Sequence, residues 1–237
     1  MSNNYFRFKK FTVLQNNTAM KVGTDGVLLG AWTDCSNVNS ILDIGTGTGL
    51  LSLMMAQKCN AKIVAIETEI NAFNQALENI KNSVWNDRIE VYHTSFQDFI
   101  QLDSKKFDLI VSNPPFFTNS LKNIDTNKSL ARHNDSLPFD ILIEGVVKLM
   151  HSFSRFCVII PFEQKKYFTD ICTFYGLFLN KSLIIKPNSN KLPKRIIIEF
   201  SFLQDIYFEK ILIIEKENRH EYTDDYISLT KDYYMAF

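Results

Sequence analysis

Cysteine is scarce in this sequence and is not arranged to build a metal site. The four cysteines, Cys35, Cys59, Cys157 and Cys172, are widely spaced and include no Cys-x-x-Cys pair. That spacing argues against a zinc site and against a disulfide framework. We therefore expect reduced, mostly buried thiols in a cytosolic protein that holds no metal.

The sequence also lacks a net charge, a long apolar run and a signal peptide. Its 26 Lys and Arg residues balance its 26 Asp and Glu residues, so overall charge predicts no polyanionic partner. No apolar run approaches the ~20 residues that span a membrane, and the N-terminus is polar and basic. We expect a cytoplasmic protein with no membrane segment. Residues 1–22 and 181–195 carry bases but no acid; each either binds phosphates locally or is solvated surface.

Strands and helices alternate along most of the 237 residues. Strands are predicted at residues 41–44, 62–67, 88–93, 107–112 and 155–160, with helices at 50–57, 70–82, 137–149 and 163–174. Such alternation predicts an α/β fold whose mostly parallel sheet has helices on both faces. Three further β segments, at 178–185, 195–203 and 207–214, imply one antiparallel strand. Residues 223–225, Thr-Asp-Asp, are predicted to cap a last helix, and a long polar loop is expected at 117–136.

We expect a single domain over residues 1–237. Residues 1–35 would form an N-terminal arm, partly alternating like an edge strand, and a short helix capped by Thr24 or Asp25. Residues 36–237 would form the α/β core with its C-terminal β segments and helix.

A glycine turn follows the first predicted strand. Residues 42–50 carry glycine at every second position of the turn, at Gly45, Gly47 and Gly49. Such a turn needs positive φ, and glycine lets a ligand approach the backbone. The spacing differs from the Gly-x-Gly-x-x-Gly of dinucleotide sites, and Asp43 at the strand end would repel a pyrophosphate. A cofactor carrying an adenosine, an ammonium and a sulfonium suits this carboxylate, and Glu67 can accept both ribose hydroxyls.

These residues resemble the class I S-adenosylmethionine-dependent methyltransferases. The resemblance implies a Rossmann-like fold with a mostly parallel seven-stranded sheet and one antiparallel strand. It implies that the glycine turn wraps the methionine moiety of S-adenosylmethionine and that Glu67 holds the ribose. Asp98 would accept from the exocyclic amine of the adenine. Thr24 either lines the methionine end or caps its helix.

A second motif, Asn-Pro-Pro-Phe at 113–116, follows the strand predicted at 107–112. Its two prolines fix φ and pre-organise the turn. The side chain of Asn113 and the main chain of Pro114 each offer a carbonyl oxygen, which matches the two hydrogens of an exocyclic amine. Accepting them exposes the nitrogen lone pair to an electrophilic methyl group, so Asn113 borders cofactor and substrate. Phe116 can stack on the base, a contact worth roughly 1–3 kcal/mol.

The second motif resembles that of methyltransferases that act on planar exocyclic or amide nitrogens. It therefore fixes the type of nitrogen and not the molecule. The substrates that remain open are the adenine N6 of DNA or RNA, the guanine N2 of ribosomal RNA and the glutamine of release factors.

A narrower resemblance covers most of the chain and is to the bacterial tRNA1(Val) (adenine(37)-N6)-methyltransferases. Its more specific parts are residues 20–32 and 222–234; residues 42–50, 113–116 and 131–133 also match. This resemblance implies methyl transfer from S-adenosylmethionine to the N6 amine of an adenosine in a valine tRNA, at position 37.

Two other enzyme classes fit the N-terminal part less well. Release-factor enzymes would carry a separate N-terminal helical domain, and about forty residues precede the glycine turn, too few for one. Ribosomal guanine enzymes often carry a duplicated domain, which this sequence lacks. An idle homologue that binds RNA as an assembly module is the alternative outside enzymes, and the retained Asn113 disfavours it.

A tRNA partner would explain the basic segments. The candidate phosphate contacts are Lys9, Lys10, Lys191, Lys194 and Arg195. Phe8 and Phe11 would lie near them. Arg132 and His133 either edge the substrate pocket or belong to a surface loop. The oligomeric state stays open, and a monomer would suffice.

Overall fold

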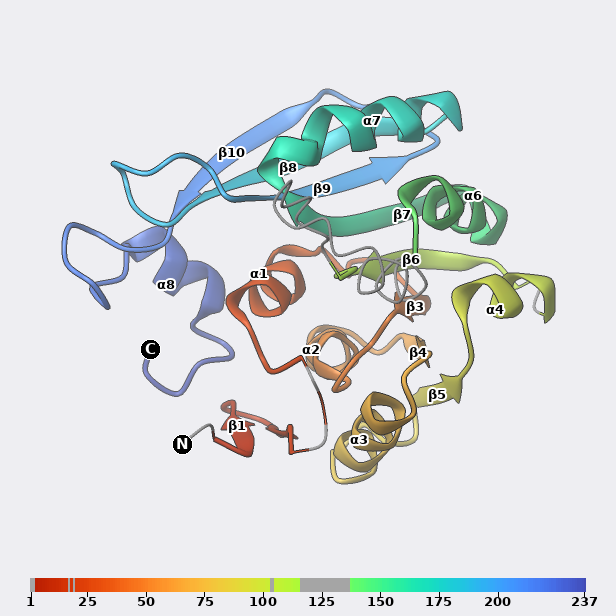
Figure 1. Ribbon diagram of the computed structural model, residues 1–237, viewed down its shortest axis with the longest axis horizontal. Coiled ribbons are helices and arrows are strands. Elements are labelled where there is room, and N and C mark those ends of the chain that lie inside the picture. Colours follow the sequence, from red (N-terminus) through yellow and green to blue (C-terminus); the bar gives the residue numbers. More distant parts are fainter. Residues whose placement is uncertain (1–2, 17, 19, 103–104, 116–136) are drawn as a thin grey trace, which may run out of the picture.

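The structure is a computed structural model that describes residues 3–16, 18, 20–102, 105–115 and 137–237. One large sheet runs through it. The sheet has eight strands in the order β10-β8-β9-β7-β6-β3-β4-β5 (Figure 1). In chain order these are β3 (Ser40–Ile44), β4 (Lys62–Glu67), β5 (Ile89–His93), β6 (Phe107–Ser112), β7 (Met150–Pro161), β8 (Phe178–Lys186), β9 (Arg195–Ser201) and β10 (Phe208–Ile213).

The strand directions confirm the predicted sheet, but the strand count differs. β9 is antiparallel to both β7 and β8, and every other neighbouring pair in the sheet is parallel. The single antiparallel strand is therefore confirmed. The expected seven strands are wrong by one, because β10 pairs in parallel with β8 along residues 208–213 and adds an outer strand.

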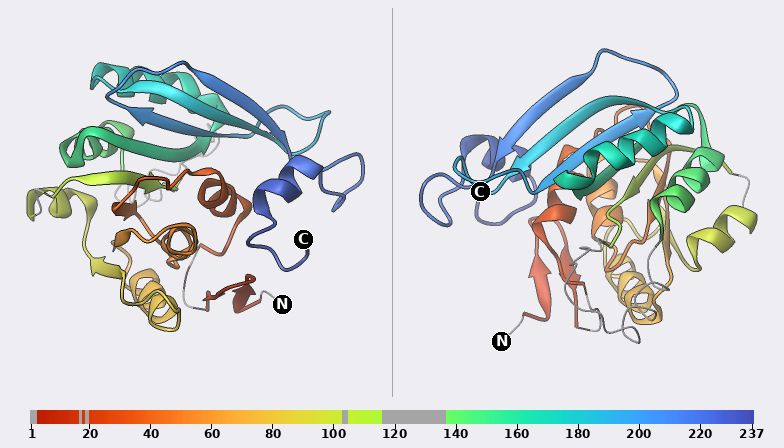
Figure 2. Two further views of the ribbon diagram at one scale, coloured as in Figure 1. Left: turned by 180° about the vertical axis from the view of Figure 1, so that it is seen from behind. Right: turned by 45° about the horizontal axis from the view of Figure 1, so that its top comes forward.

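Helices cover both faces of the sheet, as predicted (Figures 1 and 2). One face carries α1 (Thr24–Trp32), α2 (Leu50–Lys58), α3 (Ile70–Lys81) and α8 (Asp224–Thr230). The other carries α4 (Phe96–Leu102), α6 (Phe139–Leu149) and α7 (Lys165–Phe174), which a short 3-10 turn, η1 (Phe162–Gln164), precedes.

The central strands are largely apolar because both of their faces are buried. In β6, Leu109 and Val111 pack into one hydrophobic cluster, and Phe107 and Ile110 pack into the other. This explains the nearly continuous apolar sequence of that strand, which Asp108 interrupts. The short α4 was not predicted, and it places Asp98 in the first turn of a helix rather than in a loop.

The N-terminal arm is a small hairpin rather than an edge strand of the main sheet. β1 (Tyr5–Arg7) and β2 (Thr12–Leu14) pair only with each other as strands. Phe8 forms a bridge with Tyr234 near the other end of the chain, and Figure 1 shows both termini on the same side of the molecule. Phe8 and Phe11 are 1% and 7% exposed. The ring of Phe8 stacks on Phe11 and on Tyr234 of the C-terminal tail, so both phenylalanines belong to the core rather than to a surface that could contact RNA.

The cysteines are free thiols: Cys35, Cys157 and Cys172 are buried and Cys59 is half-buried. The expectation of mostly buried thiols is confirmed. In the part of the chain that the structure describes, no helix has the length and apolar character needed to cross a membrane.

Candidate cofactor and substrate site

The glycine turn lies at the carboxyl ends of β3 and β4. Gly45, Gly47 and Gly49 have φ of 71°, 59° and 82°. A Cβ at Gly45 or Gly47 would meet no heavy atom of the described residues within 4 Å. At Gly49 it would lie 3.4 Å from Ile80 of α3, so this third glycine also serves packing. The first two glycines thus present bare backbone to open space, where a ligand can lie against it.

Asp43 is fully buried two residues before Gly45. Its Oδ2 accepts from Thr46 Oγ1 at 2.6 Å, from Ser52 N at 3.1 Å and from Ser52 Oγ at 2.8 Å. Its Oδ1 is buried with no hydrogen-bond partner among the described residues. Burial raises the pKa of Asp43 to about 6, although the bonds from Thr46 and Ser52 oppose it. One open oxygen on a buried acid fits a cationic donor.

Glu67 ends β4 and braces the glycine turn. Its Oε2 accepts from the N–H of Gly47 at 2.8 Å, and its Oε1 accepts from the N–H groups of Thr68 and Glu69 at 2.8 and 2.9 Å. An ionised carboxylate has about four acceptor positions. The three backbone bonds therefore leave capacity for a ribose hydroxyl beside Gly47.

Asp98 lies in the first turn of α4 and is exposed. Its Oδ2 accepts from Ser95 Oγ at 2.6 Å, and its own N–H donates to the same hydroxyl at 3.0 Å. The N–H of Thr94 donates to the carbonyl oxygen of Glu67, which connects the segment before α4 to the end of β4. The second carboxylate oxygen can accept from an amine at this position.

Asn113 directly follows β6, whose end is tied to β3 by a bond from Ser112 Oγ to the carbonyl oxygen of Ile44. Asn113 Oδ1 is buried, and no described residue donates to it. Its Nδ2 lies under α1, because a Cβ at Gly26 would be 3.8 Å from it. Pro114 is buried. Phe116 lies outside the described residues, so its stacking role stays a prediction.

The start of α1 differs from the sequence-based expectation. The N-cap residue is Gly23, which has no side chain to cap with, and Thr24 and Asp25 lie in the first turn. Capping by Thr24 or Asp25 is therefore wrong. Thr24 is exposed. Asp25 instead accepts from Arg195 Nε at 2.7 Å, a contact that sequence analysis missed because 170 residues separate the two.

The candidate RNA-contacting residues fall into three groups. Two have side chains engaged within the protein: Lys9 Nζ donates to the carbonyl oxygens of Lys231 and Phe237, and Arg195 pairs with Asp25. Three are exposed, namely Lys10, Lys191 and Lys194. Arg132 and His133 lie outside the described residues.

S-adenosylmethionine fits the residues present. Its ammonium and sulfonium are cations, and Asp43 Oδ1 is a buried acceptor without a partner in the described chain. Its methionine part needs close approach to backbone, which Gly45 and Gly47 allow. Across the described residues no group of three or more His, Cys, Asp or Glu side chains is placed to hold a metal ion.

Residues 21–136 match the family model described as a methyltransferase small domain. A tRNA1(Val) (adenine(37)-N6)-methyltransferase from Bacteroides fragilis is 46% identical over 237 residues, covering 99% of both chains. Another from Phocaeicola vulgatus is 48% identical over 236 residues, again covering 99% of both. Among solved structures, a predicted O-methyltransferase from Agrobacterium tumefaciens superposes with a TM-score of 0.68 at 18% identity. It covers 88% of this chain and 96% of its own, which supports the fold alone.

Proposed function

The chain belongs to the family of tRNA1(Val) (adenine(37)-N6)-methyltransferases, and we propose that it methylates the N6 amine of adenosine 37 in a valine tRNA. S-adenosylmethionine would supply an electrophilic methyl group at its sulfonium. The observation that carries the proposal is the buried, unpartnered Oδ1 of Asn113 at the end of β6, among the described residues. A tRNA substrate would place the reaction in the cytosol.

The protein's part in the proposed reaction is to bind and orient. Asp43 Oδ1 would accept from the ammonium of the cofactor, Glu67 from its ribose and Asp98 from its adenine amine. Asp43 is the penultimate residue of β3, Glu67 ends β4, and Asp98 follows β5. Because the carboxyl ends of neighbouring parallel strands share one edge of the sheet, the acids can grip one extended ligand.

Methyl transfer would depend on the Asn-Pro-Pro-Phe turn. Asn113 Oδ1 and the carbonyl oxygen of Pro114 would accept the two hydrogens of the N6 amine. These bonds draw the lone pair out of conjugation and aim it at the methyl group for in-line displacement. A proton then leaves the methylated, cationic nitrogen, so no strong general base is needed.

The direct test is tritiated methyl transfer to tRNA, a DNA duplex and release factor in parallel, followed by nucleoside analysis. We expect label in N6-methyladenosine of valine tRNA only. Label in release factor, or in guanosine of ribosomal RNA added as a fourth substrate, would replace the proposed substrate. Calorimetry that shows no S-adenosylmethionine binding would leave an RNA-binding module instead of an enzyme.

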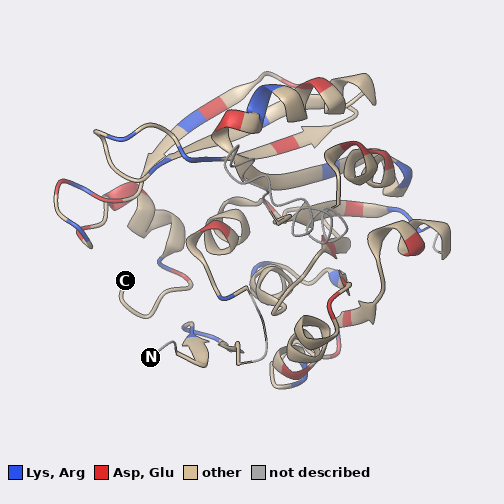
Figure 3. Ribbon diagram, in the orientation of Figure 1, with Lys and Arg blue, Asp and Glu red and all other residues tan. Residues whose placement is uncertain are grey.

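The connection between β8 and β9, residues 187–194, is a proposed RNA contact. It turns at the edge of the sheet where β7 ends, because Arg195 pairs with Pro161 there. Figure 3 shows basic segments along this connection. Lys191 and Lys194 are exposed on it, and Arg132 and Lys10 are further proposed contacts.

Replacing both lysines of the connection with alanine tests this surface. A single-stranded RNA contact contributes about −0.7 per phosphate to the slope of log affinity against log salt. We expect Lys191→Ala with Lys194→Ala to weaken tRNA binding and to flatten that slope by about 1 to 1.5. An unchanged slope would remove the connection from the RNA surface.

We also propose that residues 1–237 act as one methyltransferase domain. The hairpin residues Phe8 and Val13 and the C-terminal Tyr226 and Tyr233 share one hydrophobic cluster with α1 and α2. Removing the hairpin should therefore destabilise the whole protein in one transition. Two separate thermal transitions in the intact chain would contradict this.

A further inference from the structure

An ion pair joins two elements beside the catalytic turn. Arg195 begins β9, and its Nε donates to Asp25 Oδ2 in the first turn of α1 at 2.7 Å. Both side chains are about one-third exposed, at 32% and 31%. The N-cap of α1, Gly23, has no side chain that could cap the helix, and the Asp25–Arg195 pair joins the first turn of α1 to the start of β9.

The residue after Asp25, Gly26, faces Asn113 and the start of α2. A Cβ added to Gly26 would lie 3.8 Å from Asn113 Nδ2 and 3.0 Å from Leu50 Cδ2. Leu50 is the first residue of α2, directly after the glycine turn. The first turn of α1 is thus packed between the catalytic amide and the helix that leaves the cofactor turn. A small displacement of this turn would change the position of Asn113.

We propose that Asp25 and Arg195 are positioning residues that hold the first turn of α1 against Asn113. The inference rests on the proposed function, because the effect is on presentation of the target amine. Arg195 ends the basic run of residues 191–195 in sequence and resembles a phosphate contact there. In the fold its guanidinium is directed to α1, so it acts through Asp25 rather than on RNA.

The test is a set of isosteric or near-isosteric variants: Asp25→Asn, Arg195→Gln, their double variant and Arg195→Lys. Each neutral single variant should lower kcat at saturating valine tRNA about tenfold, below the ~100-fold that a 1 Å misplacement costs. The kcat of the double variant should be no lower than that of either single variant, because each single variant already removes the same interaction. Arg195→Lys keeps the charge and should restore most of kcat.

The direction of the change in KM for tRNA in the two single variants distinguishes a positioning role from an RNA contact. If Arg195 attracts RNA, Arg195→Gln should raise KM for tRNA while Asp25→Asn, which removes a negative charge, should lower it. Positioning instead predicts that kcat falls in both and that KM and its salt dependence stay near the wild-type values. Opposite KM changes, or additive losses of kcat, would overturn the proposal.

Glu209→Gln is the matched control. Glu209 pairs with Lys165 at 2.8 Å, with side chains 34% and 30% exposed, and belongs to β10 rather than to the site. It should leave kcat unchanged. Hydrogen exchange gives a readout without turnover: residues 24–32 should exchange faster in Asp25→Asn and Arg195→Gln but not in Glu209→Gln. Wild-type protein that fails to methylate tRNA would refute the proposed function, whereas unchanged exchange in both variants would refute this inference.

Discussion

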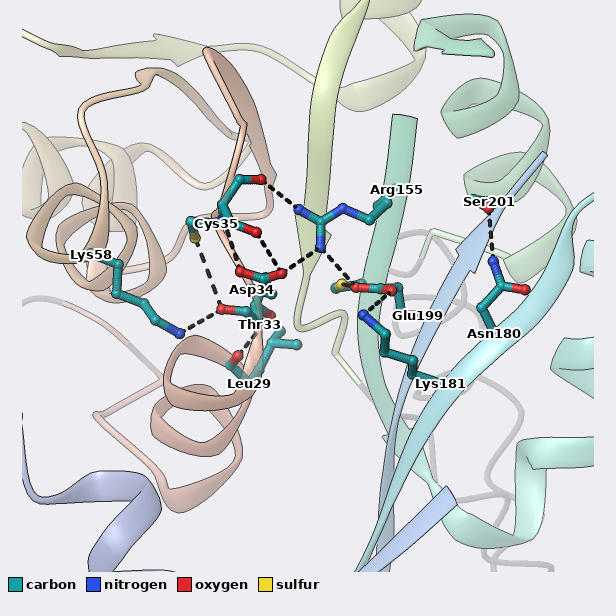
Figure 4. Close-up of polar contacts among 12 residues, drawn as sticks. Leu29, Thr33, Asp34, Cys35, Lys58, Arg155, Asn180, Lys181, Glu199 and Ser201 are labelled. Atoms are coloured by element: carbon teal, nitrogen blue, oxygen red, sulfur yellow. Dashed lines mark hydrogen bonds and ion pairs between the residues drawn. The ribbon is translucent and has the colours of Figure 1, made fainter. Parts of the chain in front are cut away.

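Two buried carboxylates lie on one row of the same sheet, and they differ in whether a cationic side chain pairs with them. The register pairs Asp43 with Val111, Val111 with Cys157, and Cys157 with Glu199. Asp43 is 0% exposed and Glu199 is 3% exposed. Glu199 forms ion pairs with Arg155 and Lys181, each at 3.2 Å, and Figure 4 shows both contacts. Asp43 has only hydroxyl and backbone donors, and its Oδ1 has no partner among the described residues.

The difference separates an acid that is paired within the fold from an acid that we propose binds the cofactor. Burying a charge is costly unless it is paired. Glu199 meets that cost with two cations of its own chain, and Arg155 also reaches Asp34 at 3.6 Å (Figure 4). The Asp43 carboxylate lies under the N-terminus of α2, where Ser52 donates to it, and its other oxygen is the one that we propose accepts from the ammonium of the cofactor. We propose that the unpaired Oδ1 of Asp43 is a ligand-binding atom.

The largest expected effect is on the other open acceptor, Asn113. Asn113→Ala removes the proposed bond to the target amine, so kcat should fall by about 10³-fold, the upper loss for one transition-state hydrogen bond. S-adenosylmethionine affinity, measured by calorimetry, should stay near the wild-type value. Lost cofactor binding in this variant would show that Asn113 holds the cofactor rather than the substrate.

Glu199→Gln should mainly affect stability. Breaking a buried ion pair costs about 3–5 kcal/mol, and the partly exposed Lys181 argues for the lower end, about 3 kcal/mol. Urea unfolding would measure it, while the kcat of the folded protein should be retained. The surface pair Glu144–Lys148 is the control, since Glu144→Gln should cost at most about 0.5 kcal/mol. Equal losses in the two variants would remove the contrast.

Asp43→Asn should reverse that pattern. It deletes the charge offered to the ammonium, a charged hydrogen bond worth about 1.5–3 kcal/mol, so S-adenosylmethionine affinity should fall roughly 10- to 150-fold. Stability without cofactor should not fall, because the variant no longer buries a charge. A variant that unfolds but binds normally in its folded fraction would make Asp43 structural, like Glu199.

The smallest expected effect is the pH dependence of cofactor affinity, which tests the role proposed for Asp43. Burial raises the pKa of Asp43 from an ordinary 3.8 to about 6. The ionised form accepts from the ammonium, so cofactor affinity should be constant well above pH 6 and fall about tenfold per pH unit below it. The contribution of Asp43 to stability has the opposite sign: it decreases as pH rises from 3.8 to about 6. In calorimetry across pH 5–8, Asp43→Asn should lose this affinity change.

Local sequence patterns predicted the parts of the site that lie within one turn of chain. The positive φ of the three glycines follows from their spacing after an apolar strand. The cap of α8 by Thr223, which accepts from Tyr226 N, is equally local. Thr24 was misassigned because a glycine, Gly23, can occupy an N-cap position as well as a residue with a side-chain acceptor can.

Contacts across the chain were beyond such patterns. Lys9 reads as a phosphate contact in sequence, yet its ammonium binds the carbonyl oxygens of residues 231 and 237. Glu199 sits in a run of isoleucines and carries no sign of Arg155 or Lys181, which come from other strands. The sequence shows which charge a side chain carries, but only the folded structure shows which partner within the protein already pairs with it.

By itself the sequence determined the alternating α/β order, the glycine turn and the rigid Asn-Pro-Pro-Phe turn, because periodicity, glycine and proline act over a few residues. Only the tertiary structure decided which buried polar groups have partners within the described part of the chain and which do not. Asp43 and Glu199 are both buried acids on one sheet row, and their difference lies in partners from distant strands and helices. Which partners a buried group finds depends on long-range packing, and that packing has no local signature.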